Sequence, residues 1–201
     1  MRPDVVIYNA SARTRWPLLE LIPADVQRSL QVTAYGAFLV AQQAARRMVP
    51  KGYGAILFTG ASASVKGYAR STPFAMGKFA VRGLAQSMAL ELAPQGIHVA
   101  HFVIDGAIRP PGHTEDSARP DSMLDPDAIA STFINILRQP RSAWTREWNY
   151  APGWSRSDDA APGALAGKHL RRRLHLCRAP HALWSNRAPL TFMLPLPRFC
   201  T

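Results

Sequence analysis

The sequence has 201 residues, of which 47% are hydrophobic, and this is enough for one domain with a buried core. Such a composition excludes a disordered polymer. No uncharged apolar run approaches the roughly 20 residues that a membrane-spanning helix needs, and the first residues do not form the apolar stretch of a signal peptide. We therefore expect a cytoplasmic protein without a membrane partner. Its two cysteines cannot build a disulfide framework or a thiolate metal site, and we expect no metal.

The net charge of +11 is unevenly distributed along the chain. Residues 1–154 carry 16 Lys and Arg against 11 Asp and Glu, whereas residues 155–201 carry 8 against 2. The second part also contains five prolines and no steady hydrophobic period. We predict a folded domain over 1–154 and a basic, poorly ordered tail over 155–201, where the sequence allows a short helix at 164–176. The tail lacks the glycine-aromatic signature of RNA-binding modules, so we do not expect a nucleic-acid partner.

Residues 4–150 alternate between apolar runs typical of buried strands and longer segments typical of helices. Prolines and glycines follow the first two helical segments, and Asp125 with Pro126 begins the third. Strands that alternate with helices form a parallel sheet covered by helices, so the sequence predicts a partial doubly wound α/β fold of about four parallel strands. The expected strands are 4–9, 55–59, 97–104 and 145–150, and the expected helices are 23–48, 72–93 and 125–138.

The third expected strand contains His98 and His101, which we expect on one face of the strand. Two histidines on one face could reach a shared metal ion, but the sequence offers no third ligand. We therefore interpret them as ordinary strand histidines with satisfied hydrogen bonds.

Four segments, in this order, resemble the short-chain dehydrogenase/reductase family over residues 4–154. DVVIYNAS at 4–11 resembles the family's strand that ends in Asn-Asn-Ala-Gly, and AILFTGASAS at 55–64 resembles the strand and loop that carry the catalytic serine. Residues 74–78 occupy the Tyr-x-x-x-Lys segment, and 78–106 resembles the following helix, strand and cofactor-facing turn. The resemblance implies strands 4 to 7 of the family's sheet. It also implies an NAD(P)-dependent oxidoreductase that acts on a small carbonyl or alcohol substrate.

The resemblance further implies which residues hold the cofactor, NAD or NADP. Asn9 and Ala10 stand in the Asn-Asn-Ala-Gly segment, Lys78 stands where the family binds the nicotinamide ribose, and Asp105 with Gly106 replaces the usual Pro-Gly. The family's Thr-Gly-x-x-x-Gly-x-Gly turn, whose backbone amides bind the pyrophosphate, is missing from the sequence. We therefore expect an N-terminally truncated member of the family, whose cofactor binding is in question.

By the same resemblance the catalytic positions are Ser62, Phe74, Lys78 and Thr33. In the family, a tyrosine transfers the proton at the substrate oxygen, a lysine four residues later lowers the pKa of that tyrosine, and a serine holds the oxygen. Positions four apart lie on one face of a helix, which explains the spacing of 74 and 78. Thr33 stands in the place of an asparagine that supports a proton relay. The serine position falls on Ser62 or, by gapless counting, on Ala61.

A phenyl ring at position 74 has no proton to transfer, so the sequence leaves two functions open. Tyr68, in the loop before Phe74, could offer a substitute phenol to an active oxidoreductase. Alternatively, the chain is a catalytically inactive relative that only self-associates. Self-association would use the apolar faces of helices 23–48 and 72–93 and the edge of strand 4–9.

Overall fold

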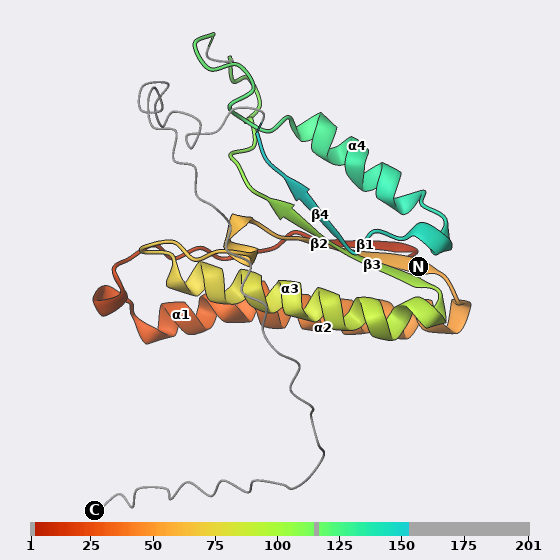
Figure 1. Cartoon of the computed structure of the whole chain (residues 1–201). Coiled ribbons are helices and arrows are strands. Elements are labelled where there is room, and N and C mark those ends of the chain that lie inside the picture. The colour runs from red at the N-terminus through yellow and green to blue at the C-terminus, as the bar shows by residue number, and fades with distance from the viewer. Residues whose placement is uncertain (1–2, 115–116, 153–201) are drawn as a thin grey trace, which may run out of the picture. The chain divides into compact units, whose positions relative to one another are not determined.

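The computed structural model describes residues 3–114 and 117–152. Four strands form one sheet in the order β1-β2-β3-β4, and every neighbouring pair is parallel (Figure 1). This confirms the predicted α/β fold and the four predicted strands. The predicted tail over 155–201, its helix at 164–176 and the domain boundary before it lie outside the described residues. The strands are β1 (Val5–Tyr8), β2 (Gly54–Thr59), β3 (Ile97–Ile104) and β4 (Glu147–Tyr150).

Helices cover both faces of the sheet (Figure 1). The first predicted helix is continuous but consists of three parts, α1 (Pro23–Leu30), the π-helical turn η2 (Gln31–Tyr35) and α2 (Gly36–Met48). It lies with α3 (Thr72–Leu92) on one face, and α4 (Pro126–Leu137) lies on the other face. The side chain of Asp125 accepts a hydrogen bond from the backbone N–H of Asp127 at 3.0 Å and caps α4, as predicted. Short 3-10 turns occupy Leu18–Glu20, Val49–Lys51, Ser62–Ser64, Ala93–Gln95 and Arg141–Ala143.

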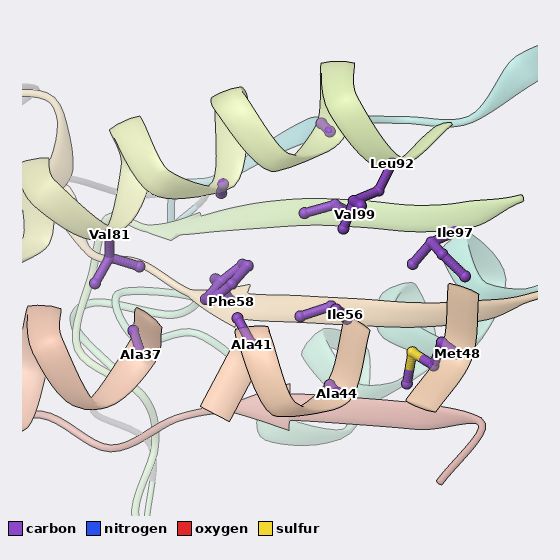
Figure 2. Packing of buried hydrophobic residues seen from close by; sticks show 12 residues of the cluster. Ala37, Ala41, Ala44, Met48, Ile56, Phe58, Val81, Leu92, Ile97 and Val99 are labelled. Atoms are coloured by element: carbon purple, nitrogen blue, oxygen red, sulfur yellow. The ribbon is translucent and has the colours of Figure 1, made fainter. Parts of the chain in front are cut away.

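The larger hydrophobic cluster lies between α2, α3 and the strands β2 and β3 (Figure 2). Its helical members on α2 are mostly alanines, at positions 37, 41 and 44, so the helix backbone can approach the sheet closely. Ile56 and Phe58 of β2 fill the space beneath the two helices, and both are fully buried. The alternation of side chains along β2 points Leu57 to the other face. There it packs in a second cluster with Phe102 and with Ile136 of α4.

Strand β1 differs from the expectation that it would be buried on both sides. Val6 and Tyr8 are partly buried against the α2 side, whereas Val5 is 43% and Ile7 51% exposed. The cause is that α4 does not cover β1. The hydrophobic cluster under α4 includes residues of β2 and β3 but none of β1. Among the described residues β1 pairs only with β2, so its outer edge carries no ladder partner there. The prediction of a fully buried strand was wrong for β1.

The expectation that His98 and His101 share a strand face was also wrong. They are three residues apart, and side chains alternate along a strand with a period of two. The ring of His98 stacks on Trp144 at 4.7 Å, with its Nε2 2.8 Å from the carbonyl oxygen of Thr145. His101 instead lies beside Glu147, on the face that holds α3. Within residues 3–114 and 117–152, no group of three or more His, Cys, Asp and Glu side chains could hold a metal ion.

No helix in the described part of the chain is long and apolar enough to cross a membrane.

Candidate functional site

The carboxyl ends of β1, β2 and β3 meet at one edge of the parallel sheet, as they must when neighbouring strands run in the same direction. The loops that follow them begin at Asn9, Gly60 and Asp105. In open α/β sheets, ligands bind at this edge. All candidate site residues predicted from the sequence lie in these loops or on the helices that follow them.

A cavity of about 580 Å³ lies at this edge. It brings together Ser62, Phe74, Asp105 and Gly106, four residues that the sequence placed in the site. Asn9, Ala10, Lys78 and Thr33 are not among its lining residues. The cavity is also lined by four residues with functional groups that the resemblance did not assign to the site, namely Arg13, Arg15, Tyr68 and Ser71.

Phe74 and Lys78 lie in the first two turns of α3, whose N-terminal turn contains Pro73. The ammonium group of Lys78 lies 5.8 Å from the centroid of the Phe74 ring. Lys78 is only 4% exposed, and its Nζ donates a hydrogen bond of 2.7 Å to the carbonyl oxygen of Thr59, at the end of β2. Burial lowers the pKa of Lys78 to about 8. The helix thus fixes a buried cation next to the lining of the cavity.

The serine loop after β2 forms a 3-10 turn in which the two serines have different environments. Ser64 is fully buried, and its Oγ accepts a hydrogen bond of 3.1 Å from the backbone N–H of Ala61, so this serine holds the turn together. Ser62 lines the cavity and Ala61 does not. Of the two positions that the sequence left open, the geometry favours Ser62 as the hydroxyl that can contact a ligand.

Thr33 is fully buried in the π-helical turn η2, where its Oγ1 accepts a hydrogen bond of 3.0 Å from the backbone N–H of Ala12. The hydroxyl of Ser29 donates to the carbonyl oxygen of Ala12 at 3.0 Å. These two bonds tie the loop after β1 to the helix. A Cβ atom at Gly77 would lie 2.9 Å from the Cβ of Thr33, so α3 and η2 are in close contact here. Thr33 therefore positions the loop that carries Arg13 and Arg15.

One ion pair borders the cavity, between the loops after β2 and β3. Lys66 forms an ion pair of 2.9 Å with Asp105, and its Nζ lies 5.6 Å from the centroid of the Tyr68 ring. The hydrogen bond to Asp105 and then the one to Tyr68 raise the pKa of Lys66. Asp105 is thereby neutralised by a neighbour outside the cavity, and the phenol of Tyr68 lies beside a protonated lysine.

A second group of charges lies one turn further along α3. Arg82 forms two hydrogen bonds with Glu147 of β4, at 2.7 and 2.8 Å, and the Nδ1 of His101 lies 3.3 Å from the same carboxylate. The arginine lowers the pKa of Glu147, and burial lowers the pKa of His101. Arg82 follows Lys78 by four residues, and this spacing was the signal by which the sequence could have identified it. The group fixes the register of α3 against β4.

The sequence is similar to a known protein family and to individual proteins. The family described as short chain dehydrogenase matches residues 2–118. The chain is 35% identical over 106 residues to the L-2,3-butanediol dehydrogenase of Corynebacterium glutamicum, covering 52% of this chain and 41% of that protein. It is also 35% identical over 136 residues to the uncharacterized oxidoreductase YohF of Escherichia coli (strain K12), covering 65% and 50% of the two chains. The chain thus spans about half or less of the length of these relatives.

The fold is similar to that of solved structures. A short-chain dehydrogenase from Rhodopseudomonas palustris superposes with a TM-score of 0.63 at 35% identity, over 74% of this chain and 62% of that one. The likeness covers the greater part of the described sheet and helices.

Proposed function

Because the chain belongs to the short-chain dehydrogenase family, we propose that it forms the substrate side of an oxidoreductase site that interconverts an alcohol and a carbonyl compound with NAD or NADP. The observation that carries the proposal is the position of Lys78. Its buried ammonium group lies at the end of β2, bound to the carbonyl oxygen of Thr59 and next to the cavity that Ser62 and Phe74 line. Among the described residues Lys78 has no acidic partner. Burial of such a lysine costs free energy of folding, and residues of this kind concentrate at functional sites.

The residues at this edge fit the nicotinamide end of the cofactor. The ammonium of Lys78 has three donors and uses one for Thr59, so donors remain for the ribose hydroxyls. Asn9 and Ala10 follow β1, Asp105 and Gly106 follow β3, and all four would line the cofactor crevice at this edge of the sheet. The sequence of 201 residues contains no Thr-Gly-x-x-x-Gly-x-Gly turn for the pyrophosphate, so we propose that this chain holds the cofactor weakly. When bound, the cofactor would supply or accept the hydride.

The chain's own residues would orient the substrate and move one proton. Ser62 would hold the substrate oxygen with its hydroxyl. Phe74 cannot donate a proton, and we propose Tyr68 as its replacement, because this phenol lines the same cavity. In the reducing direction the Tyr68 hydroxyl would give its proton to the carbonyl oxygen, and the protonated Lys66 beside the ring would stabilise the phenolate that forms.

The substrate class is supported by the relatives. One of them is named for L-2,3-butanediol, a small alcohol. A cavity of about 580 Å³ has room for a compound of this size, and its lining contains the hydroxyl of Ser62 next to small apolar side chains such as Ala63 and Ala107. We therefore propose a small carbonyl or alcohol compound as the substrate.

A second candidate function is self-association without catalysis. Phe74 supports it, because a phenyl ring at this position has no proton to transfer. Its further support is a groove of about 840 Å³ over α1, η2 and α3, which is lined by exposed side chains including Tyr35, Phe38 and Met76. The rings of Tyr35 and Phe38 stack at 6.1 Å. An apolar surface of this kind is typical of contacts between proteins.

Acetoin is the carbonyl compound formed when 2,3-butanediol loses two hydrogen atoms. Its steady-state reduction, followed by the absorbance of NADH or NADPH, separates the two functions. We expect Tyr68→Phe to lower kcat by about 100-fold or more, the usual contribution of a positioned proton donor. Tyr53→Phe is the matched control, because Tyr53 is 54% exposed and lies outside the cavity. Adding Phe74→Tyr to the Tyr68→Phe variant should restore turnover. Turnover that is insensitive to Tyr68→Phe would contradict this proton donor, and the lack of turnover in every variant would leave self-association as the function.

A further inference from the structure

We infer that Arg13 and Arg15 bind the carboxylate of a small acid in the cavity beside Phe74. The inference extends the proposed function, since it names the substrate class of the same cavity. It depends on the geometry and charge of one loop, the segment that follows β1.

The two guanidinium groups have no acidic partner among the residues that the structure describes. Neither takes part in an ion pair, whereas the acid that lines the same cavity, Asp105, is already paired with Lys66 at 2.9 Å. Burial and then the charge of Arg15 lower the pKa of Arg13, which means that the two cations lie close enough to repel each other. Two adjacent cations that line one cavity favour an anion between or beside them.

Phe74 gives one of these cations a fixed place. The guanidinium carbon of Arg13 lies 4.9 Å from the centroid of the Phe74 ring, in cation–π contact. Such a contact uses the face of the guanidinium and leaves its N–H donors in the plane free to bind a ligand. The loop itself is held by the hydrogen bonds of Ala12 to Thr33 and Ser29. Phenylalanine in place of a phenol thus positions an arginine at the cavity.

The chemistry of the two guanidinium groups selects an oxyanion. Planar guanidinium groups bind carboxylates through two parallel hydrogen bonds, and they also bind phosphate in this way. A cavity of about 580 Å³ that is also lined by Ser62 suits a small acid. The carboxylate of this acid would contact the arginines, and its carbonyl or hydroxyl oxygen would contact the Ser62 hydroxyl. Phosphate shares the anionic chemistry, and the experiment below distinguishes the two anions.

Isothermal titration calorimetry without cofactor tests the inference on the full chain. The probes are acetoacetate and acetoacetamide, which have the same carbonyl group and similar size but differ in charge. We expect acetoacetate to bind at least about tenfold more tightly than acetoacetamide, as a charge-assisted pair requires, and also more tightly than inorganic phosphate, which offers no separate carbonyl oxygen to Ser62. Arg13→Gln with Arg15→Gln should weaken acetoacetate binding by about tenfold or more. Arg28→Gln with Arg46→Gln, at exposed positions on α1 and α2, also removes two positive charges, and this charge-matched control should bind like the wild type.

The variant with Arg13→Lys and Arg15→Lys retains both charges but loses the planar fork, so we expect intermediate affinity. Circular dichroism shows whether the glutamine variant folds. If it does not fold, the lysine variant replaces it in the binding measurement. Equal binding of acid and amide, equal binding of phosphate and acetoacetate, undiminished binding in the arginine variants, or no binding of acetoacetate would overturn the inference. Because no cofactor is present, the result is independent of turnover. An enzyme that reduces acetoin but does not prefer acetoacetate would retain the proposed function without this site.

Discussion

The ammonium group of Lys78 lies 5.8 Å from the centroid of the Phe74 ring, one helical turn away on the same face of α3. An aromatic face attracts a cation, and here it shares this role with the carbonyl oxygen of Thr59. Neither partner carries a negative charge. The lysine is therefore held as a buried cation with a lowered pKa, a state that costs stability unless a ligand uses it.

The pH dependence of stability should report this lysine. The pKa of Lys78 is about 8 in the folded chain and close to its ordinary value of 10.5 in the unfolded chain. Between these values the unfolded chain binds more protons, so the free energy of unfolding rises with pH, by up to about 3 kcal/mol. Urea unfolding of the wild type and of Lys78→Met at pH 7.5 and 10 measures the difference. We expect the wild type to gain stability relative to the variant as the pH rises, and parallel curves would contradict a buried cation that has only uncharged partners.

The Arg82–Glu147 pair should stabilise the packing of α3 on β4. Its two hydrogen bonds, at 2.7 and 2.8 Å, are the charge-assisted kind, so we expect Glu147→Gln to lower the free energy of unfolding by about 1–2 kcal/mol at pH 7. The pKa of Glu147 is lowered, so its contribution is present above the ordinary carboxyl range and is lost as the pH falls through the folded pKa. The difference between wild type and variant should shrink in acid. Glu91→Gln, at an exposed position of α3, should change little at any pH.

Gly77 and Gly83 of α3 provide a matched test of the close contact between α3 and η2. A Cβ at Gly77 would meet the side chain of Thr33 at 2.9 and 3.0 Å, whereas a Cβ at Gly83 would meet nothing within 4 Å. We expect Gly77→Ala to lower the free energy of unfolding by about 1–3 kcal/mol through overpacking. Gly83→Ala should raise it by up to about 1 kcal/mol, because alanine is the better helix former. Thermal unfolding of both variants checks the pair, and equal shifts would show that α3 and η2 are not in contact.

How much the sequence predicts depends on whether a feature is local. The alternation of apolar runs and helical segments predicted all four strands and the helix boundaries, because burial periodicity and caps are local signals. The exposure of Ile7 was missed because it depends on how far α4 reaches across the sheet. Arg13 was missed because a loop residue has no periodicity, and only the folded chain brings it over Phe74. The prediction that Ser62 and Phe74 belong to one site came from the resemblance and from the order of its segments, and both residues line the cavity.

Self-association should have two separable contributions. Phe38 is 40% exposed in the groove over α1, η2 and α3, and Ile7 is 51% exposed on the edge strand β1. Multi-angle light scattering over a range of concentrations should show heterogeneous oligomers of the wild type, with pairing at the β1 edge as the larger contribution. We expect Ile7→Lys to remove the species that grow with concentration, and Phe38→Glu to convert the remaining dimer to monomer. Wild type that stays a single species on dilution would contradict association at the β1 edge.

The rate of acetoin reduction by the wild type and by Lys78→Ala shows whether Lys78 marks the substrate side of an oxidoreductase site. We predict measurable turnover that rises in proportion to NADH or NADPH over the accessible range, because the chain offers few contacts to the pyrophosphate. Lys78→Ala should abolish this turnover, whereas the control Lys51→Ala, on the turn before β2, should retain it. Equal rates for wild type and Lys78→Ala, or rates no higher than without protein, would contradict the account.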